Sequence, residues 1–158
     1  MTEPRKVGFR LERDADGYPP AENEWLWAAR APDGGWMIDN IPWYSRDVSL
    51  GDVVEAEEDE DGQLWFRATA EPSGHSTLRV LPREQDAGVA ARLRRGLEEL
   101  GCTTEQYSRK LPMLAVDVPD DVDITAVVAY LDEGETRDAW GWETGLLSEA
   151  HRSQWPTQ

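Results

Sequence analysis

The hydrophobic pattern of this chain changes its period near residue 72, and that change limits the possible folds more than any other feature. Before residue 72, apolar residues alternate over short stretches separated by turns that contain Gly or Pro, a pattern typical of β-strands. The clearest hairpin joins residues 52–56 to residues 63–69 through an acidic turn that ends in Asp61 and Gly62. About five short strands without a helix predict a small antiparallel sheet that curls into a barrel, because curling removes exposed edges.

After residue 72 the pattern takes on the helical period. Residues 87–100 and residues 123–133 each carry apolar side chains on one face and charged side chains elsewhere, which predicts two amphipathic helices. The expected capping and terminating residues are Asp86 and Gly101 for the first helix and Asp123 and Gly134 for the second.

Four strand candidates surround these helices, over residues 76–81, 103–108, 113–118 and 140–147. The order strand, helix, strand, strand, helix, strand predicts a ferredoxin-like βαββαβ unit with both helices on one face of the sheet. The predicted fold class is therefore α+β. Residues 1–72 form the strand-rich half with the small barrel, residues 73–147 form the ferredoxin-like half, and residues 148–158 form a polar, flexible tail.

The charge of the chain excludes several classes of partner. Its 32 Asp and Glu residues against 16 Lys and Arg give a formal net charge of −16. Such a surface repels nucleic acid and anionic lipid, so we expect neither nucleic-acid binding nor membrane binding. Two interpretations remain open, because the charge can serve solubility or the recognition of a basic protein partner.

The sequence lacks the residue patterns that metal and cofactor sites need. The single cysteine, Cys102, and the two histidines, His75 and His151, are too few and too scattered for zinc. The acidic turn imitates a calcium loop, but its twelfth position is Ala68 instead of glutamate. Glycine-rich phosphate loops are absent from the sequence, so we predict no metal and no cofactor. One cysteine cannot form an intramolecular disulfide, and no apolar run could serve as a leader or span a bilayer, which predicts a cytoplasmic location.

Two segments contain residue types that carry function. Residues 73–77 combine His75 with three hydroxyl groups and a glycine, which fits part of a hydrolase triad or a simple turn into a strand. Residues 41–46 contain Trp43, Tyr44 and Arg46, which fits a recognition loop or an aromatic cover over the open end of the barrel.

Several sequence segments resemble the uncharacterised bacterial family known as domain of unknown function 4265. They read V-G-F-R-L-E-R-D-A-D-G-Y-P-P at residues 7–20, I-D-N-I-P-W-Y-S-R-D-V-S-L-G-D-V-V at residues 38–54, L-W-F-R at residues 64–67, S-G-H-S-T at residues 73–77, L-G-C at residues 100–102 and A-V-D-V-P at residues 115–119. The resemblance extends over residues 6–147 and implies a small bacterial protein without transferable catalytic residues. It directs attention to the motif positions Asn40, Pro42, Arg46, Gly51, Asp52 and His75.

These observations together favour a non-enzymatic binding protein, immunity-like or regulatory, that recognises a basic protein partner. The predicted binding residues are Asn40, Trp43, Tyr44, Arg46, Asp52 and His75. The alternative is a small enzyme or a small-ligand sensor with a polar site around His75 and the loop of residues 41–46, in which His75 would be the catalytic candidate.

Overall fold

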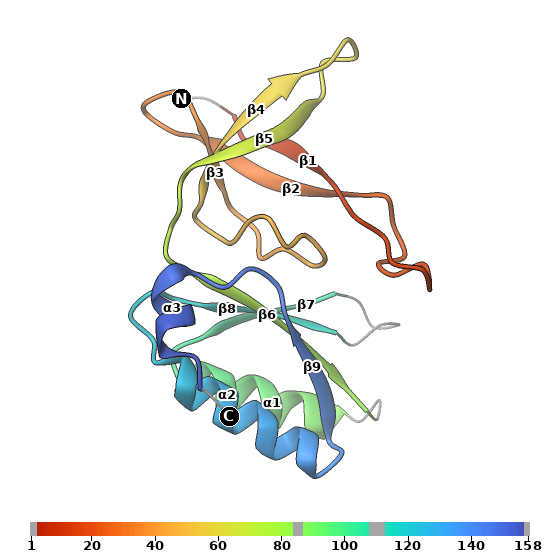
Figure 1. The fold of residues 1–158 in the computed structure, drawn as a ribbon, viewed down its shortest axis with the longest axis vertical. Coiled ribbons are helices and arrows are strands. Elements are labelled where there is room, and N and C mark those ends of the chain that lie inside the picture. The colour runs from red at the N-terminus through yellow and green to blue at the C-terminus, as the bar shows by residue number, and fades with distance from the viewer. Residues whose placement is uncertain (1–2, 84–86, 108–112, 157–158) are drawn as a thin grey trace. The chain divides into compact units, whose positions relative to one another are not determined.

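The computed structural model of the protein describes residues 3–83, 87–107 and 113–156 and has an α+β fold (Figure 1). The chain consists of two compact units, Met1–Ser73 and Gly74–Gln158. The first unit contains strands only, whereas the second combines strands and helices. None of the described helices is both long enough and apolar enough to cross a membrane.

The first unit is a closed five-stranded barrel, as the alternating sequence pattern predicts. Its strands are β1 (Arg5–Arg10), β2 (Asn23–Arg30), β3 (Trp36–Ile38), β4 (Val53–Glu58) and β5 (Leu64–Glu71). Neighbours along the chain pair antiparallel, so the first and fifth strands run in the same direction. The barrel closes through a parallel pair in which Val7 lies opposite Leu64 and Gly8 opposite Trp65.

Each strand of the barrel contributes apolar side chains to its interior. Its buried cluster consists of Val7, Phe9, Leu26, Ala28, Trp36, Ile38, Val48, Val54 and Leu64. The two tryptophans that mark β2 in the sequence lie on its other face, where Trp25 is half-buried and Trp27 is 45% exposed. Alternation thus identifies the strand, but Leu26 and Ala28, and not the larger tryptophans, face the interior.

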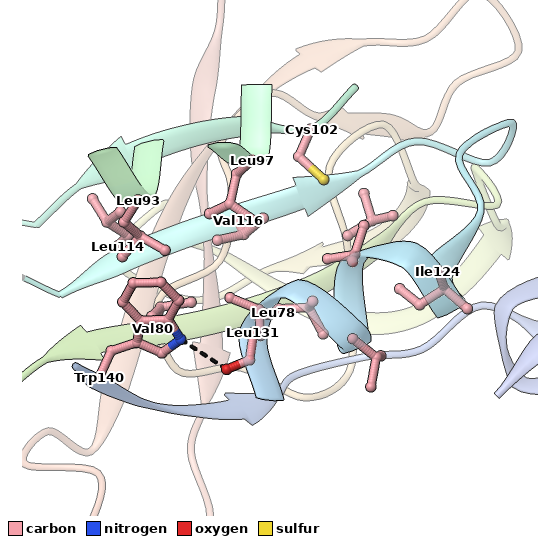
Figure 2. Close-up of a cluster of buried hydrophobic side chains, with 13 residues drawn as sticks. Leu78, Val80, Leu93, Leu97, Cys102, Leu114, Val116, Ile124, Leu131 and Trp140 are labelled. Carbon is pink, nitrogen blue, oxygen red and sulfur yellow. Dashed lines mark hydrogen bonds between the residues drawn. The ribbon is translucent and has the colours of Figure 1, made fainter. Parts of the chain in front are cut away.

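The second unit contains a four-stranded antiparallel sheet with the order β7-β8-β6-β9. Its elements in chain order are β6 (Ser76–Pro82), α1 (Ala87–Glu99), β7 (Thr103–Gln106), β8 (Leu114–Val118), α2 (Ile124–Thr136), β9 (Trp140–Thr144) and α3 (Glu149–Gln154). Helices α1 and α2 lie side by side and cover the same face of the sheet (Figure 1), as their single apolar faces predict. Figure 2 shows the thirteen buried side chains that fill the space between these helices and the sheet.

The ends of α1 and α2 follow local capping chemistry. Helix α1 ends at Glu99 and is followed by Gly101, whose φ is +99°, and the amide of Cys102 donates to the carbonyl of Leu97 as in a Schellman motif. Asp123 caps α2 through the amide of Thr125 at 3.0 Å. The helix is expected to end near Gly134, and α2 ends two residues later, at Thr136. Asp86 and Ser108, expected at a helix cap and a strand end, lie outside the described residues.

The prediction of a flexible tail over residues 148–158 is corrected by α3. Ser148 caps this short helix, and the side chain of His151 is fully buried. The ring of His151 accepts a hydrogen bond from the Ser76 hydroxyl through Nδ1 and donates to the carbonyl of Val122 through Nε2 at 3.1 Å. Because both ring nitrogens find partners in the interior, a polar sequence can still anchor the helix.

Candidate functional site

The loop between β3 and β4, residues 39–52, carries five of the six binding residues that the sequence predicts. Two of them fix the loop to the barrel. Asn40 accepts a hydrogen bond from the amide of Trp27 at 2.7 Å. Asp52 is buried and accepts from the amides of Ser49 at 3.0 Å and Ser73 at 2.8 Å. Their side chains thus position the loop, while their role in binding stays a prediction.

Glu24 on β2 holds the aromatic part of this loop and is missing from the sequence-based set of site residues. Its carboxylate is 7% exposed and accepts hydrogen bonds from three consecutive backbone amides, those of Trp43, Tyr44 at 3.0 Å and Ser45 at 2.8 Å. A carboxylate that accepts several amide hydrogen bonds is strongly stabilised. The sequence signal for Glu24 is its spacing, because positions 24, 26 and 28 share one face of a strand and Leu26 and Ala28 point inward.

The side chains of Trp43, Tyr44 and Arg46 in this loop are at least partly accessible to solvent. Trp43 and Tyr44 are half-buried, and Arg46 is exposed. The ring of Tyr44 meets the ring of Tyr18 edge to face, with 6.0 Å between centroids. The loop therefore combines a fixed backbone with partly accessible aromatic and basic side chains, which suits recognition.

The hairpin of β4 and β5, which the sequence predicts only as two strands with an acidic turn, also carries a groove. This groove of about 360 Å³ opens along the hairpin. Its walls are Arg10, Glu57, Glu58, Asp59, Trp65, Phe66 and Arg67. Of the seven residues 55–61, six are acidic, and all six are exposed. The groove thus joins an acidic hairpin tip to the indole ring of Trp65.

Asp59 organises the tip of this hairpin. Its Oδ1 accepts from the amides of Asp61 and Gln63, both at 2.9 Å, and its Oδ2 accepts from Nε1 of Trp65 at 2.8 Å. The hydrogen bond from the Trp65 indole, followed by the one from Gln63, lowers the pKa of the Asp59 carboxyl below its ordinary value. Asp59 therefore stays negatively charged at neutral pH and keeps the indole in place.

Cations already occupy part of the outer barrel surface beside the groove. The guanidinium of Arg10 lies over the ring of Trp65, 4.2 Å from its centroid, and Arg67 pairs with Glu57. The rings of Trp25 and Trp65 contact each other with centroids 4.8 Å apart. Both rings cover Gly8, where an added Cβ would come within 3.0 Å of each of them. The glycine therefore leaves room for the two indoles to pack against the sheet at this position.

In the second unit, His75 pairs with Asp117 of β8. Nδ1 of His75 lies 2.9 Å from Oδ2 and 3.0 Å from Oδ1 of Asp117. The Asp117 side chain is 3% exposed and that of His75 is 26% exposed. Since an ionised carboxylate only accepts, Nδ1 carries the proton in this pair. The sequence signal for Asp117 is one acidic residue inside the otherwise apolar strand A-V-D-V-P.

The neighbouring serines have other roles than attack on a substrate. The Ser76 hydroxyl is fully buried and donates to His151, and the Ser73 hydroxyl donates to the carbonyl of Leu50 at 2.8 Å. Cys102 is also buried, and burial followed by the charge of Asp117 raises the pKa of its thiol to about 12. Across residues 3–83, 87–107 and 113–156, no three His, Cys, Asp or Glu side chains are grouped so that they could hold a metal ion.

Comparison with known proteins bears on family and fold. The structure is similar to that of a hypothetical protein from Neisseria gonorrhoeae, with a TM-score of 0.76 and 20% sequence identity over 94% of this chain and 98% of that one. At this identity the likeness shows the fold alone. No curated protein matches the chain. The family model described as domain of unknown function (DUF4265) matches residues 24–142, about three quarters of the sequence. The resemblance seen in the sequence motifs is therefore confirmed, and the chain belongs to the DUF4265 family.

Proposed function

We propose that this protein is a non-enzymatic binding protein that recognises a basic protein partner, in an immunity-like or regulatory role. The observation that carries the proposal is the groove of the β4–β5 hairpin, in which three carboxylates stand beside an indole ring. Carboxylates and aromatic faces are the groups that attract a guanidinium or ammonium group. An arginine or lysine side chain of the partner is the chemistry that suits this groove.

The contact between Arg10 and Trp65 supports this choice of chemistry. It places a guanidinium over the same indole whose Nε1 donates to Asp59. The chain itself thus provides an example of a guanidinium held over this ring face, near enough to Asp59 for its charge to help lower the pKa of that carboxyl. A partner arginine on this side of the groove would compete with Arg67, which pairs with Glu57, and with Arg5, whose Nη1 lies 3.8 Å from Oε2 of Glu58.

The β3–β4 loop is the second contact in the proposal. Trp43, Tyr44 and Arg46 would meet the partner, with Asn40 and Asp52 holding the loop in its shape. Because Glu24 already fixes the backbone of Trp43 and Tyr44, little conformational entropy is lost when they bind. The net charge of −16 adds long-range attraction that speeds the encounter at low salt.

An arginine-rich peptide titrated by calorimetry tests the groove directly. We expect the double substitution Glu57→Lys and Glu58→Lys to lower its affinity by about tenfold, and Trp43→Ala to lower the affinity for a folded basic partner. The matched control is Glu98→Lys with Glu135→Lys, which changes the net charge equally at exposed positions of the second unit. Equal losses for both double variants would mean that only net charge matters and would contradict a groove site.

The second candidate function is an enzyme that uses His75, and it rests on the contact with Asp117. A buried carboxylate at Nδ1 orients the imidazole so that Nε2 could serve as a general base. The substitution His75→Gln separates the two functions. Removal of a general base typically costs about 10²- to 10⁴-fold in turnover, while peptide affinity would stay unchanged. Loss of hydrolysis of a p-nitrophenyl ester in His75→Gln would favour the enzyme.

The proposal extends to the fold of the second unit, the division into domains and the cellular location. We infer that residues 73–147 form a ferredoxin-like unit, supported by the strand order β7-β8-β6-β9, in which the first and third strands of the unit are central. We also infer that residues 1–72 and 73–147 act as separate domains. The cytoplasm is the proposed location, supported by a single cysteine that cannot form an intramolecular disulfide.

A further inference from the structure

A small hollow lies in the second unit among α1, α2 and β9. Its volume is about 200 Å³, and it is lined by Val89, Arg92, Tyr130, Arg137, Ala139 and Trp140. It uses none of the residues discussed above as partner-binding or catalytic candidates. Two features, an aromatic floor and a basic rim, indicate which chemistry fits it.

Two aromatic rings form the floor. The rings of Tyr130 and Trp140 contact each other with centroids 5.6 Å apart. Trp140 is 3% exposed, and its Nε1 donates to the carbonyl of Leu131 at 2.9 Å (Figure 2). The rings lie against helix positions without side chains, because a Cβ added at Gly96 would overlap Tyr130 and one added at Gly134 would overlap Trp140. The floor is therefore built into the packing of both helices.

Tyr130 stays neutral in this floor. Burial raises the pKa of its phenol, so the hydroxyl remains protonated and donates to the carbonyl of Arg92 at 3.3 Å. Together with Val89 and Ala139, the two rings make most of the hollow apolar. A flat hydrocarbon group can cover the rings and gain the stabilisation of aromatic stacking.

Two guanidinium groups form the rim. Arg92 is exposed on α1, and Arg137 is exposed at the C-cap of α2. Within the described part of the chain, neither has a carboxylate oxygen within 4.0 Å, whereas Arg67 and Arg83 do. Guanidinium groups bind carboxylates through paired hydrogen bonds, which an ammonium group cannot match. On a chain with a net charge of −16, two such cations beside an apolar hollow are an uncommon combination.

We propose that this hollow binds a small organic anion that has one flat apolar group and one carboxylate. The apolar group lies against the half-buried ring of Tyr130, beside the small accessible part of Trp140, and the carboxylate receives hydrogen bonds from Arg92 and Arg137. The hollow is smaller than the roughly 300–1,000 Å³ of sites for drug-sized molecules, so the ligand has a single ring or a short chain. A ligand of that size binds with a dissociation constant in about the micromolar to millimolar range.

Phenylacetate is a suitable probe, and phenylacetamide is its neutral counterpart of the same shape. We expect titration of the ¹⁵N-labelled full chain with phenylacetate to shift amide signals of Arg92, Arg137 and Ala139 and the indole signal of Trp140. Phenylacetamide should bind about tenfold more weakly, because it cannot form charge-assisted hydrogen bonds. Arg92→Gln and Arg137→Gln should each lower the affinity for phenylacetate and leave the affinity for phenylacetamide unchanged.

Arg95→Gln is the matched control, since Arg95 is an exposed arginine of the same helix that does not line the hollow. It should bind phenylacetate like the unchanged chain. Ala139→Leu should fill the hollow and abolish binding of both probes, with the remaining spectrum reporting that the fold is intact. Shifts confined to other parts of the chain, equal affinity for both probes, equal losses in Arg92→Gln and Arg95→Gln, or no shift up to about 10 mM would each overturn the proposal.

Discussion

Glycine residues inside the long helices of the second unit have a packing role that overrides their low helix propensity. Gly134 is buried within α2 and leaves room for the indole of Trp140, and Gly96 leaves room for Tyr130 in the same way on α1. Glycine in a helix interior costs roughly 0.5–1 kcal/mol relative to alanine. The contact with Trp140 explains why α2 continues through the glycine near which the sequence pattern predicts its end.

Substitution of Gly134 by alanine should destabilise the protein. The gain in helix propensity is small, whereas the added Cβ would overlap a ring that is 3% exposed and hydrogen-bonded. Overpacking of this kind costs about 1–3 kcal/mol, which should appear as a lower free energy of unfolding in urea. Gly96→Ala is the comparison, because the half-buried Tyr130 can turn away. A larger loss for Gly96→Ala than for Gly134→Ala would contradict this account.

Glu24 should prove as important for the β3–β4 loop as any residue in the loop itself. In Glu24→Gln one acceptor oxygen is replaced by an NH₂ group that faces backbone donors of residues 43–45. We expect a loss of about 1–3 kcal/mol in the free energy of unfolding and faster amide hydrogen exchange at Tyr44 and Ser45. Glu22→Gln is the control, because Glu22 is an exposed glutamate two residues before Glu24. Unchanged exchange at these amides would show that another contact holds the loop.

At the scale of elements, strands and long helices follow from the sequence because their signals are local. Period-2 alternation and glycine-containing turns define the five barrel strands, and the Schellman motif at Gly101 and the cap at Asp123 define helix ends. Helix α3 is missed because six residues carry too little periodic pattern, and its anchor, His151, depends on Ser76, which is distant in the chain. The sequence alone does not show which face of β2 turns inward, because both faces carry apolar residues.

The candidate site is less predictable than the fold for the same reason. His75 is found as an unusual residue in a turn, but its partner Asp117 depends on the pairing of β6 with β8. The groove of the hairpin depends likewise on Arg10, which the parallel pairing of β1 with β5 brings to Trp65. Register between distant strands is set by the whole barrel or sheet, so a single sequence shows the members of a site more readily than their neighbours.

The β4–β5 hairpin should lose part of its stabilisation in acid. The pKa of Asp59 is lowered in the folded chain, so its ionised form stabilises the fold at pH values above the unfolded value of about 3.9. This contribution is lost as the pH falls through the lower folded pKa. Asp59→Asn should therefore be less stable than the unchanged chain at pH 7, and the difference in free energy of unfolding should shrink below about pH 4.

Urea unfolding at several pH values measures this difference. Asp61→Asn removes an equal charge from the same turn without touching the indole of Trp65 and should change the free energy of unfolding little at any of these pH values. A difference for Asp59→Asn that persists unchanged in acid would mean that charge is not what stabilises the turn.

At the scale of the whole molecule, each compact unit has a hydrophobic cluster of its own. Among the described residues, one buried cluster of thirteen residues lies in the second unit and another of nine lies in the barrel. A domain with its own core can fold alone. We therefore expect a fragment of residues 74–158 to give a dispersed NMR spectrum and a cooperative urea transition. In that fragment Leu97→Ala should cost about 2–5 kcal/mol, because Leu97 is fully buried. A collapsed, non-cooperative fragment would show that the second unit needs the first.

The parallel pair that closes the barrel has a kinetic consequence. Val7 and Gly8 are among the first residues of the chain, and their partners Leu64 and Trp65 lie on the last barrel strand. During synthesis β1 can pair with β2 before β5 has been made. Until β1 and β5 pair, each has one unpaired edge. Long-range pairing slows folding, because the chain loses the entropy of closing a long loop before the stabilising contacts form. Closure of the barrel should therefore be the slow step of folding in the first unit, and substitutions at Gly8 should affect the refolding rate only if this pair is already formed in the transition state.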